Sequence, residues 1–217
     1  QKALNTLYVN MRDTYFDCPE RERAQDLQAQ WGKVIRVGLD GSIPADNPFA
    51  GEAAPGVWST GHRNVQGAAL APDGTLWIAE MGPRGGDELQ PARPGLNYGW
   101  PVVSYGINYD GTPVGSGETS APGFEEPAYY WDPVIAPGGI DFYEGSLFPD
   151  WQGDLLIGGL RAESLVRVRL EEGRVVGEER VLPGVGRVRD VEELPDGSLL
   201  LLIDEADAPI QRLTPAG

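Results

Sequence analysis

The sequence predicts an all-β protein, and three observations support this class. Thirty of the 217 residues are glycine and 19 are proline, which favours many tight turns. No long segment places apolar residues at helical spacing, whereas short apolar runs follow turn residues throughout the chain. An apolar fraction of 41% is enough for a hydrophobic core, so we expect one sizeable globular domain or two small ones.

The individual elements follow from local patterns. Residues 6–9 are expected to form a strand, so close to the first residue that the chain is expected to begin within a fold. Residues 20–30 are the one expected helical or coil excursion, and residues 32–37 return to a strand that ends at the Asp40-Gly41 turn. Residues 104–128, rich in Gly, Ser, Thr and Pro, are expected to be a long loop on one face.

A short unit recurs in which Pro-Asp-Gly precedes an apolar run. It occurs at residues 70–78 and 194–203, with a looser copy at residues 148–157. Proline fixes φ and Asp-Gly forms the turn, so each apolar run is expected to be a strand buried on both faces. Units spaced by roughly 40 to 50 residues are typical of propeller blades, and the chain has room for about four of them. Because an open arc exposes sheet edges, either the ring is small or further blades lie outside this sequence.

Charge excludes several classes of partner. The formal net charge of −16 opposes binding to nucleic acid or to an anionic membrane surface. Only Lys2 and Lys33 among the 17 basic residues are lysines, so most cations are guanidinium groups suited to carboxylates or phosphates, unless a compositional bias explains them.

Cysteine content and hydropathy add two further limits. Cys18 is the only cysteine, so no internal disulfide is possible. No apolar run approaches the ~18 residues that span a bilayer, so we expect no membrane insertion. No charged-then-apolar leader is visible in these residues, so we expect any export signal to have been removed or to lie upstream.

Seven longer motifs stand in order along the chain, at residues 31–36, 40–49, 61–67, 82–88, 97–101, 105–111 and 186–191. Together they resemble the soluble quinoprotein sugar dehydrogenases, the aldose sugar dehydrogenase branch of the glucose/sorbosone dehydrogenase family. The resemblance covers nearly the whole chain. It implies a six-bladed β-propeller, of which residues 1–217 would be a single domain covering about four blades, with the cofactor pyrroloquinoline quinone (PQQ) held by Ca²⁺.

The resemblance assigns cofactor contacts to a set of basic and amide side chains. Arg63 and Asn64 would reach the quinone, where Arg63 would stabilise an oxygen that gains negative charge during hydride uptake. Arg161, Arg187 and Arg189 match the family's basic residues, although lysine is more common at the position of Arg161. PQQ is a tricarboxylate, so several guanidinium groups suit it. Arg187 and Arg189 would point to the same face, because they lie two residues apart in a strand. Alternatively, Arg63 forms a surface salt bridge, and Arg187 and Arg189 are solvated charges at the edge of a blade.

The same resemblance implies two calcium sites. Ca²⁺ prefers oxygen ligands, including backbone carbonyls. The carbonyls of Gly82 and Pro83 would hold the PQQ-bound ion, while Glu88 and the carbonyl of Tyr98 would hold a structural one. A Gly-rich loop lets carbonyls approach a common point without obstruction by side chains. Alternatively, Asp87 and Glu88 form an exposed acidic turn.

Two further groups of residues have two interpretations each. Tyr109 and Asp110 lie in a loop that closes over the cofactor in the family, but Tyr-Asp-Gly is also an ordinary turn sequence. Trp100, Tyr129 and Trp131 are candidates for a wall that stacks on a sugar ring, or for packing within blades.

The implied activity is oxidation of the anomeric carbon of aldose sugars to lactones, with electrons passing to PQQ and then to an external acceptor. The family's general base is a histidine. The only histidine here, His62, belongs to the Gly-His-Arg-Asn motif, and we expect it to orient that loop. The base would precede residues 6–9, and residues 10–13 also depart from the family pattern. We therefore interpret the sequence as the C-terminal two-thirds of an enzyme, and the resemblance does not decide whether these residues alone are active.

Two other functions compete with this interpretation. A non-catalytic propeller that binds a sugar or a protein partner needs no general base. A lactonase-like hydrolase needs acidic and amide ligands around an axial metal, and these do not cluster in the sequence. The resemblance also implies a periplasmic or secreted protein, whereas the particular sugar, the acceptor and the oligomeric state do not follow from the sequence.

Overall fold

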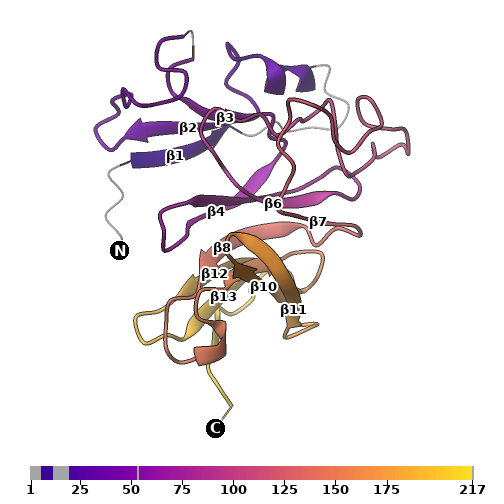
Figure 1. The fold of residues 1–217 in the computed structure, drawn as a ribbon. Helices are drawn as coiled ribbons and strands as arrows, with labels where there is room; N and C mark the ends of the chain where they lie inside the picture. Colours follow the sequence, from indigo (N-terminus) through magenta and orange to yellow (C-terminus); the bar gives the residue numbers. More distant parts are fainter. Residues whose placement is uncertain (1–5, 12–19, 53, 217) are drawn as a thin grey trace. The chain divides into compact units, whose positions relative to one another are not determined.

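The computed structural model describes residues 6–11, 20–52 and 54–216, and its regular structure is almost entirely β (Figure 1). The prediction of an all-β fold is confirmed. The described residues form fourteen strands and two short 3₁₀ helices: β1 (Thr6–Met11), η1 (Arg21–Gln25), β2 (Lys33–Gly38), β3 (Val57–Thr60), β4 (Val65–Leu70), β5 (Leu76–Glu80), β6 (Asp87–Pro91), β7 (Tyr129–Trp131), β8 (Pro137–Phe142), η2 (Pro149–Trp151), β9 (Leu155–Gly159), β10 (Ser164–Glu171), β11 (Arg174–Val181), β12 (Val188–Glu193), β13 (Leu199–Ile203) and β14 (Gln211–Leu213).

The strands of the described residues form four sheets with consecutive strands side by side. Their orders are β1-β2-β3, β4-β5-β6-β7, β11-β10-β9-β8 and β12-β13-β14. This hairpin topology is the one expected of propeller blades. The described parts of the chain fall into two compact units, which are Gln1–Val65 with Gly82–Gly86 and Ala92–Pro127, and Gln66–Met81 with Asp87–Pro91 and Ala128–Gly217.

In the first unit, a buried lysine joins η1 to β2. The ammonium group of Lys33, fully buried, donates hydrogen bonds to the carbonyl oxygens of Arg23, Ala24 and Trp31 at 2.9, 2.8 and 2.7 Å. These bonds offset the cost of burying the charge. The expected excursion at residues 20–30 is therefore confirmed as a short 3₁₀ helix that is fastened to the sheet.

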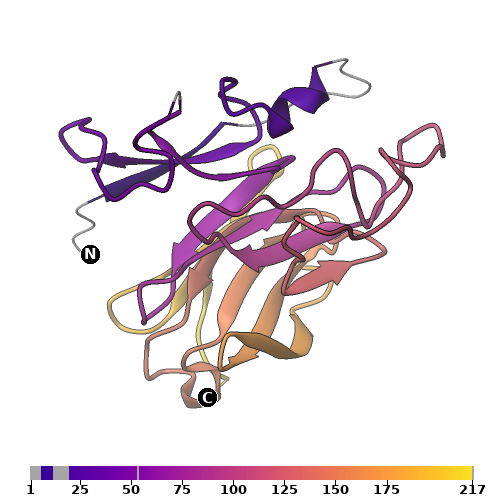
Figure 2. The same ribbon diagram turned by 45° about the horizontal axis from the view of Figure 1, so that its top comes forward.

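In the second unit, the hydrophobic core lies between neighbouring sheets. Strands β5 and β6 pack their apolar side chains against β8, β9 and β10, and the strands of the sheet β11-β10-β9-β8 run side by side in orange tones in Figure 2. A further cluster joins Leu156 and Leu165 to Val191, Leu199 and Leu201. Burial of these sheet faces is the main source of stability for such an architecture.

The three Pro-Asp-Gly units differ more than their sequences suggest. All five residues of β5 are buried, and so are all five of β9, which confirms strands covered on both faces. The same prediction is wrong for β13, where Leu202 is 45% exposed, because only one face of this sheet is covered within the described residues. In the looser copy, the proline begins the short helix η2 instead of a plain turn.

Other expectations can be compared directly with the structure. Residues 104–128 contain no strand, which confirms the long loop. The departure from the family pattern at Arg12 and Asp13, as well as Cys18, lies outside the described residues. None of the helices in the described chain has the length and apolar character needed to cross a membrane.

Asp141 in β8 gives the fold a pH dependence. Its carboxylate accepts a hydrogen bond from the backbone N–H of Glu193 at 3.1 Å. Burial nevertheless raises the pKa of Asp141 from 3.8 to about 6, and the nearby charge of Glu192 adds to the rise. Because the pKa is higher in the folded state, the carboxyl stabilises the fold when protonated, and this contribution is lost as the pH rises through about 6.

We therefore expect the Asp141→Asn variant, which keeps an oxygen acceptor and cannot ionise, to show a weaker dependence of its unfolding free energy on pH. Between about pH 4 and pH 7 the wild type should lose about 1 kcal/mol of unfolding free energy relative to the variant, after allowance for partial exposure. Chemical denaturation at a series of pH values measures this difference. A difference that stays constant over the range would contradict the assignment.

Candidate functional site

The Gly-His-Arg-Asn motif is positioned by a short backbone ladder in the first unit. Tyr98 N–H donates to the carbonyl of Thr60 at 2.9 Å, and Trp100 N–H donates to the carbonyl of Gly61 at 3.0 Å. Gly61 has a φ of +74°, and a Cβ there would lie 2.2 Å from the side-chain oxygen of Asn97. The turn out of β3 therefore requires glycine. We call the two hydrogen bonds that join Tyr98 to Thr60 and Trp100 to Gly61 the 60–100 ladder.

An amide pair fastens this ladder to η1. The side chains of Gln25 and Asn97 exchange hydrogen bonds of 3.1 and 2.7 Å, and Gln25 also donates to the carbonyl of Trp100 at 2.6 Å. Three polar contacts between distant parts of the chain thus hold the ladder in one register. The sequence offered no signal for this pair, because its members are 72 residues apart.

His62 occupies a structural position. It is fully buried, its Nε2 lies 2.8 Å from the hydroxyl oxygen of Ser59, and its ring stacks on Tyr98 at 4.8 Å between centroids. A side chain enclosed in this way cannot reach a sugar at the surface. This agrees with the expectation that His62 orients the loop.

Arg63 follows His62 and is half-buried. Its Nη1 donates a hydrogen bond to the carbonyl oxygen of Gly82 at 2.9 Å, and its guanidinium carbon lies 5.3 Å from the ring centroid of Trp100. The ladder explains the contact with Trp100, since it brings Tyr98 against His62 and Trp100 against Arg63. Trp100 therefore supports a cation here.

The Gly82–Gly86 turn has the chemistry of a cation site. Its backbone pairs with Ile107 through two hydrogen bonds with Arg84, at 3.2 and 3.1 Å. Gly86 has a φ of +69°, and a Cβ there would lie 2.4 Å from the backbone nitrogen of Gly106. The carbonyl oxygen of Gly82 accepts a hydrogen bond from the cationic guanidinium of Arg63, so this oxygen is exposed to a positive charge, as a metal ligand would be. The Gly82 carbonyl thus has the chemistry of a calcium ligand, and the calcium site that the family resemblance implies stays a prediction.

Asp87 and Glu88 do not form an exposed acidic turn, and that interpretation is wrong. Both begin strand β6, and Asp87 is 1% exposed, with its carboxylate accepting a hydrogen bond from the backbone N–H of Ala136 at 2.7 Å. Burial raises the pKa of Glu88 well above its usual range, and the charges of Glu80 and Asp87 raise it further. Among the described residues, no group of three or more His, Cys, Asp or Glu side chains is arranged to hold a metal.

In the second unit, Arg187 and Arg189 share one carboxylate. Their Nη2 atoms lie 3.1 and 2.8 Å from the same oxygen of Asp204, which confirms that the two side chains point to one side. The hydrogen bond from Arg187 and, to a smaller degree, that from Arg189 hold the pKa of Asp204 below its usual range. Each guanidinium carries five N–H donors, so the pair has donors beyond those given to Asp204.

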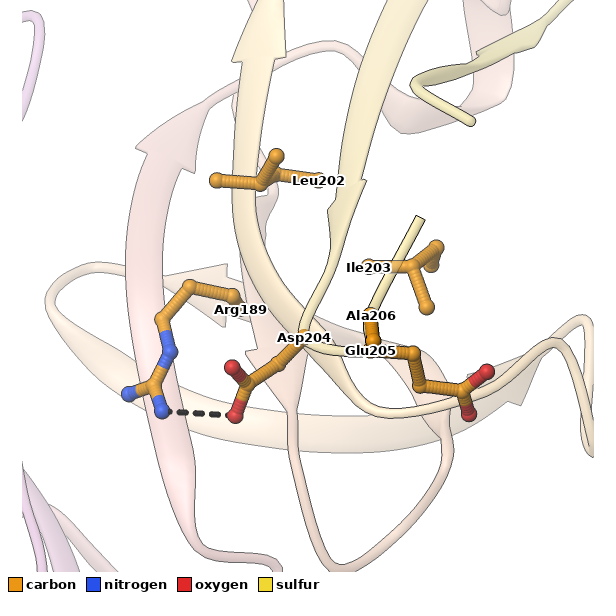
Figure 3. A pocket seen from close by; sticks show the side chains of 6 residues that line it. All are labelled: Arg189, Leu202, Ile203, Asp204, Glu205 and Ala206. Carbon is orange, nitrogen blue, oxygen red and sulfur yellow. Dashed lines mark hydrogen bonds and ion pairs between the residues drawn. The ribbon is translucent and has the colours of Figure 1, made fainter. Parts of the chain in front are cut away.

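A pocket of about 240 Å³ adjoins this ion pair. Figure 3 shows the guanidinium of Arg189 facing Asp204, whereas the carboxylate of Glu205 points the other way. The exposed side chain of Leu202 adds an apolar wall. A cation beside an apolar surface suits a flat organic acid, although the two carboxylates reduce the positive potential.

The structure says less about the other residues that were predicted to contact the cofactor. Asn64 is half-buried just before β4, and Arg161 is exposed in the turn after β9. Tyr109 is 46% exposed, and Asp110 forms a local turn by accepting from the N–H and hydroxyl of Thr112 at 2.9 and 2.7 Å. That turn is the ordinary one that the sequence also allowed.

Tyr129 and Trp131 pack within a sheet rather than forming a wall for sugar. Trp131 is 4% exposed, and both side chains donate to the same carboxylate oxygen of Glu178, at 3.1 and 2.8 Å. Sequence reasoning missed Asp204, whose place beside the arginines follows from the pairing of two strands. Val188 pairs with Ile203 across a hairpin, and the N–H of Asp204 donates to the carbonyl of Arg187 at 2.8 Å, so Asp204 lies opposite Arg187.

Comparison with known protein families matches residues 2–212 to the model described as Glucose / Sorbosone dehydrogenase. The chain belongs to the glucose/sorbosone dehydrogenase family. It is 42% identical over 202 residues to an aldose sugar dehydrogenase of Escherichia coli strain K12, covering 90% of this chain and 54% of that protein. The chain spans about half the length of the curated relatives that it matches.

Solved structures agree with this membership. A glucose dehydrogenase superposes with a TM-score of 0.90 at 42% identity, covering 97% of this chain and 61% of that one. The PQQ-bound aldose sugar dehydrogenase of Streptomyces coelicolor superposes with a TM-score of 0.73 at 30% identity, covering 96% and 58%. The expected relation to six-bladed propellers of the glucose/sorbosone dehydrogenase family is therefore confirmed.

The position of His62 leads to a stability prediction. His62→Ala removes the hydrogen bond to Ser59, the stacking on Tyr98 and a buried ring, so we expect a loss of about 2–4 kcal/mol in unfolding free energy. Ser59→Ala removes the hydrogen bond alone and should cost about 1–2 kcal/mol. Urea denaturation compares the two. A His62→Ala variant within about 0.5 kcal/mol of wild type would contradict a structural role.

Proposed function

We propose that this chain carries the PQQ and calcium sites of an aldose sugar dehydrogenase, and that residues 1–217 belong to one propeller domain. The observation that carries the proposal is the contact of the Arg63 guanidinium with the Gly82 carbonyl at 2.9 Å. It joins two family motifs at the point where the cofactor and its metal would meet. The PQQ-bound relative from Streptomyces coelicolor supports the choice of cofactor.

Each group of residues then has a specific task. The carbonyls of Gly82 and Pro83 would hold the calcium ion at the cofactor, while Glu88 and the carbonyl of Tyr98 would hold a structural ion. Glu88 suits a cation, because its neighbours Glu80 and Asp87 make an uncompensated negative charge there unfavourable.

The arginines bind and orient an anionic cofactor. Arg187 and Arg189, which Asp204 already holds together, would donate to carboxylates, with Arg161 as a further basic contact. Arg63 and Asn64 would donate to quinone oxygens, where a fixed positive charge stabilises developing negative charge. The loop with Tyr109 and Asp110 would cover the cofactor and limit access of water.

When bound, PQQ would supply the hydride acceptor for oxidation of the anomeric carbon of an aldose to a lactone. His62 would take no proton from the sugar, because it is enclosed by Ser59 and Tyr98. The family's histidine base would then belong to a segment of the whole protein that precedes residues 6–9. The substrate, the external electron acceptor and a periplasmic or secreted location are all part of this proposal.

Binding of PQQ distinguishes this function from a non-catalytic propeller that recognises a sugar or a protein. In the presence of Ca²⁺, we expect the chain to bind PQQ, and Arg187→Ala and Arg189→Ala each to weaken binding by about tenfold or more, as charge-assisted hydrogen bonds are lost. Equilibrium titration followed by absorbance or tryptophan fluorescence measures the dissociation constants.

Arg174→Ala is the matched control. Arg174 lies in β11, its side chain is 80% exposed, and it pairs with Glu172 at 3.6 Å, so its loss changes the net charge equally without touching a proposed contact. Binding that weakens equally in all three variants would show an effect of net charge alone. No binding of PQQ by the wild type would favour the non-catalytic module.

A further inference from the structure

One carboxylate in the second unit lies between two arginines with a proposed role in binding the cofactor. The Nη2 atoms of Arg187 and Arg189 lie 3.1 and 2.8 Å from the same oxygen of Asp204. Figure 3 shows the guanidinium of Arg189 facing that carboxylate beside the pocket. Among the described residues, Asp204 is the one carboxylate that forms an ion pair with either arginine.

The backbone of this site is fixed independently of the side chains. The N–H of Asp204 donates to the carbonyl oxygen of Arg187 at 2.8 Å, which holds the two residues opposite each other. Strand β12 also lies so close to β8 that a Cβ at Gly138 would lie 2.2 Å from the carbonyl oxygen of Arg189. The fold thus places the backbones of both arginines and of Asp204, and leaves the direction of the side chains to be decided.

Burial does not decide that direction. The side chains of Arg187 and Arg189 are 46% and 38% exposed, and an arginine with this freedom loses conformational entropy when a ligand orders it. Two neighbouring guanidinium groups also repel each other. A carboxylate between them offsets the repulsion and favours the side-chain conformations in which both groups point to one side.

We propose that Asp204 is a positioning residue, which holds the two guanidinium groups together before the cofactor binds, so that their remaining N–H donors meet its carboxylates. The inference rests on the proposed function, because it concerns the contact of this pair with PQQ. Asp204 acts here by orientation, since its own negative charge opposes an anionic ligand. Order that exists before binding lowers the entropy lost on binding.

Glu205 offers a control of equal charge. Its carboxylate lines the same pocket and points away from the ion pair in Figure 3. The variants Asp204→Asn, Asp204→Ala and Glu205→Gln each remove one negative charge from this pocket. They differ in what the arginines retain, which is the carboxylate in Glu205→Gln, an amide oxygen in Asp204→Asn and neither in Asp204→Ala.

The test titrates PQQ in excess Ca²⁺ into the full chain and its variants, with absorbance as the readout. We expect the affinity to fall in the order Glu205→Gln, Asp204→Asn, Asp204→Ala, with about tenfold between the first and the last. This ratio should persist between about 0.1 M and about 1 M salt, because salt screens charge and not orientation. Urea denaturation checks that each variant folds, as expected for a half-buried Asp204 and an exposed Glu205.

Nitrogen-15 relaxation of the arginine side chains gives a second readout that needs no PQQ. We expect the Nε–H groups of Arg187 and Arg189 to be ordered in the wild type and in Glu205→Gln, and to become mobile in Asp204→Ala. Arg174, whose side chain is 80% exposed, is the mobile reference in the same spectra.

The two readouts separate the inference from the proposed function. Equal PQQ affinity in the three variants, or tighter binding by Asp204→Ala than by Glu205→Gln, would overturn the inference. Unchanged order of the arginine side chains in Asp204→Ala would overturn it as well. If the wild type binds no PQQ but the arginines become mobile in Asp204→Ala, the positioning role of Asp204 stands and the proposed function is rejected.

Discussion

The 60–100 ladder is the constraint on which the candidate site depends. Two backbone hydrogen bonds align Thr60 and Gly61 with Tyr98 and Trp100. This alignment puts aromatic rings against His62 and Arg63 in turn, and the guanidinium of Arg63 also donates to the Gly82 carbonyl. The amide pair of Gln25 and Asn97 holds the register, which makes the position of Arg63 a property of the fold rather than of one side chain.

The positively charged residues of the candidate site are arginines, although the chain as a whole is acidic. Lys33 uses its charge inside the fold, where three carbonyl oxygens surround its ammonium group. Arg63, Arg187 and Arg189, by contrast, each meet an oxygen acceptor and keep further donors, because a guanidinium presents several N–H groups. A ligand that binds them need not organise them, although it must compete with the acceptors already present.

Local sequence patterns predicted the strands well wherever local chemistry decides the outcome. Proline and Asp-Gly fix the turn before β5, so that strand could be placed in advance. The apolar run at β9 and the Gly-, Ser-, Thr- and Pro-rich composition of the long loop after β6 had the same effect. The burial of β13 was predicted wrongly, because an apolar run does not reveal how many faces a neighbouring sheet covers.

The site was less accessible to sequence reasoning. Resemblance to the family named Arg63 and Gly82 separately, but their contact depends on a fold that brings residues 19 positions apart together. Asp204 and the burial of Asp87 were missed because each depends on a partner in another part of the chain. Contacts of this kind are decided by tertiary packing, which local propensity does not encode.

The most direct test of this account is a crystal structure obtained with both Ca²⁺ and PQQ. The account predicts a calcium ion about 2.3 to 2.6 Å from the carbonyl oxygen of Gly82 and a quinone oxygen within hydrogen-bond reach of the Arg63 guanidinium. A structure in which PQQ and calcium bind away from Gly82 and Arg63 would contradict the account.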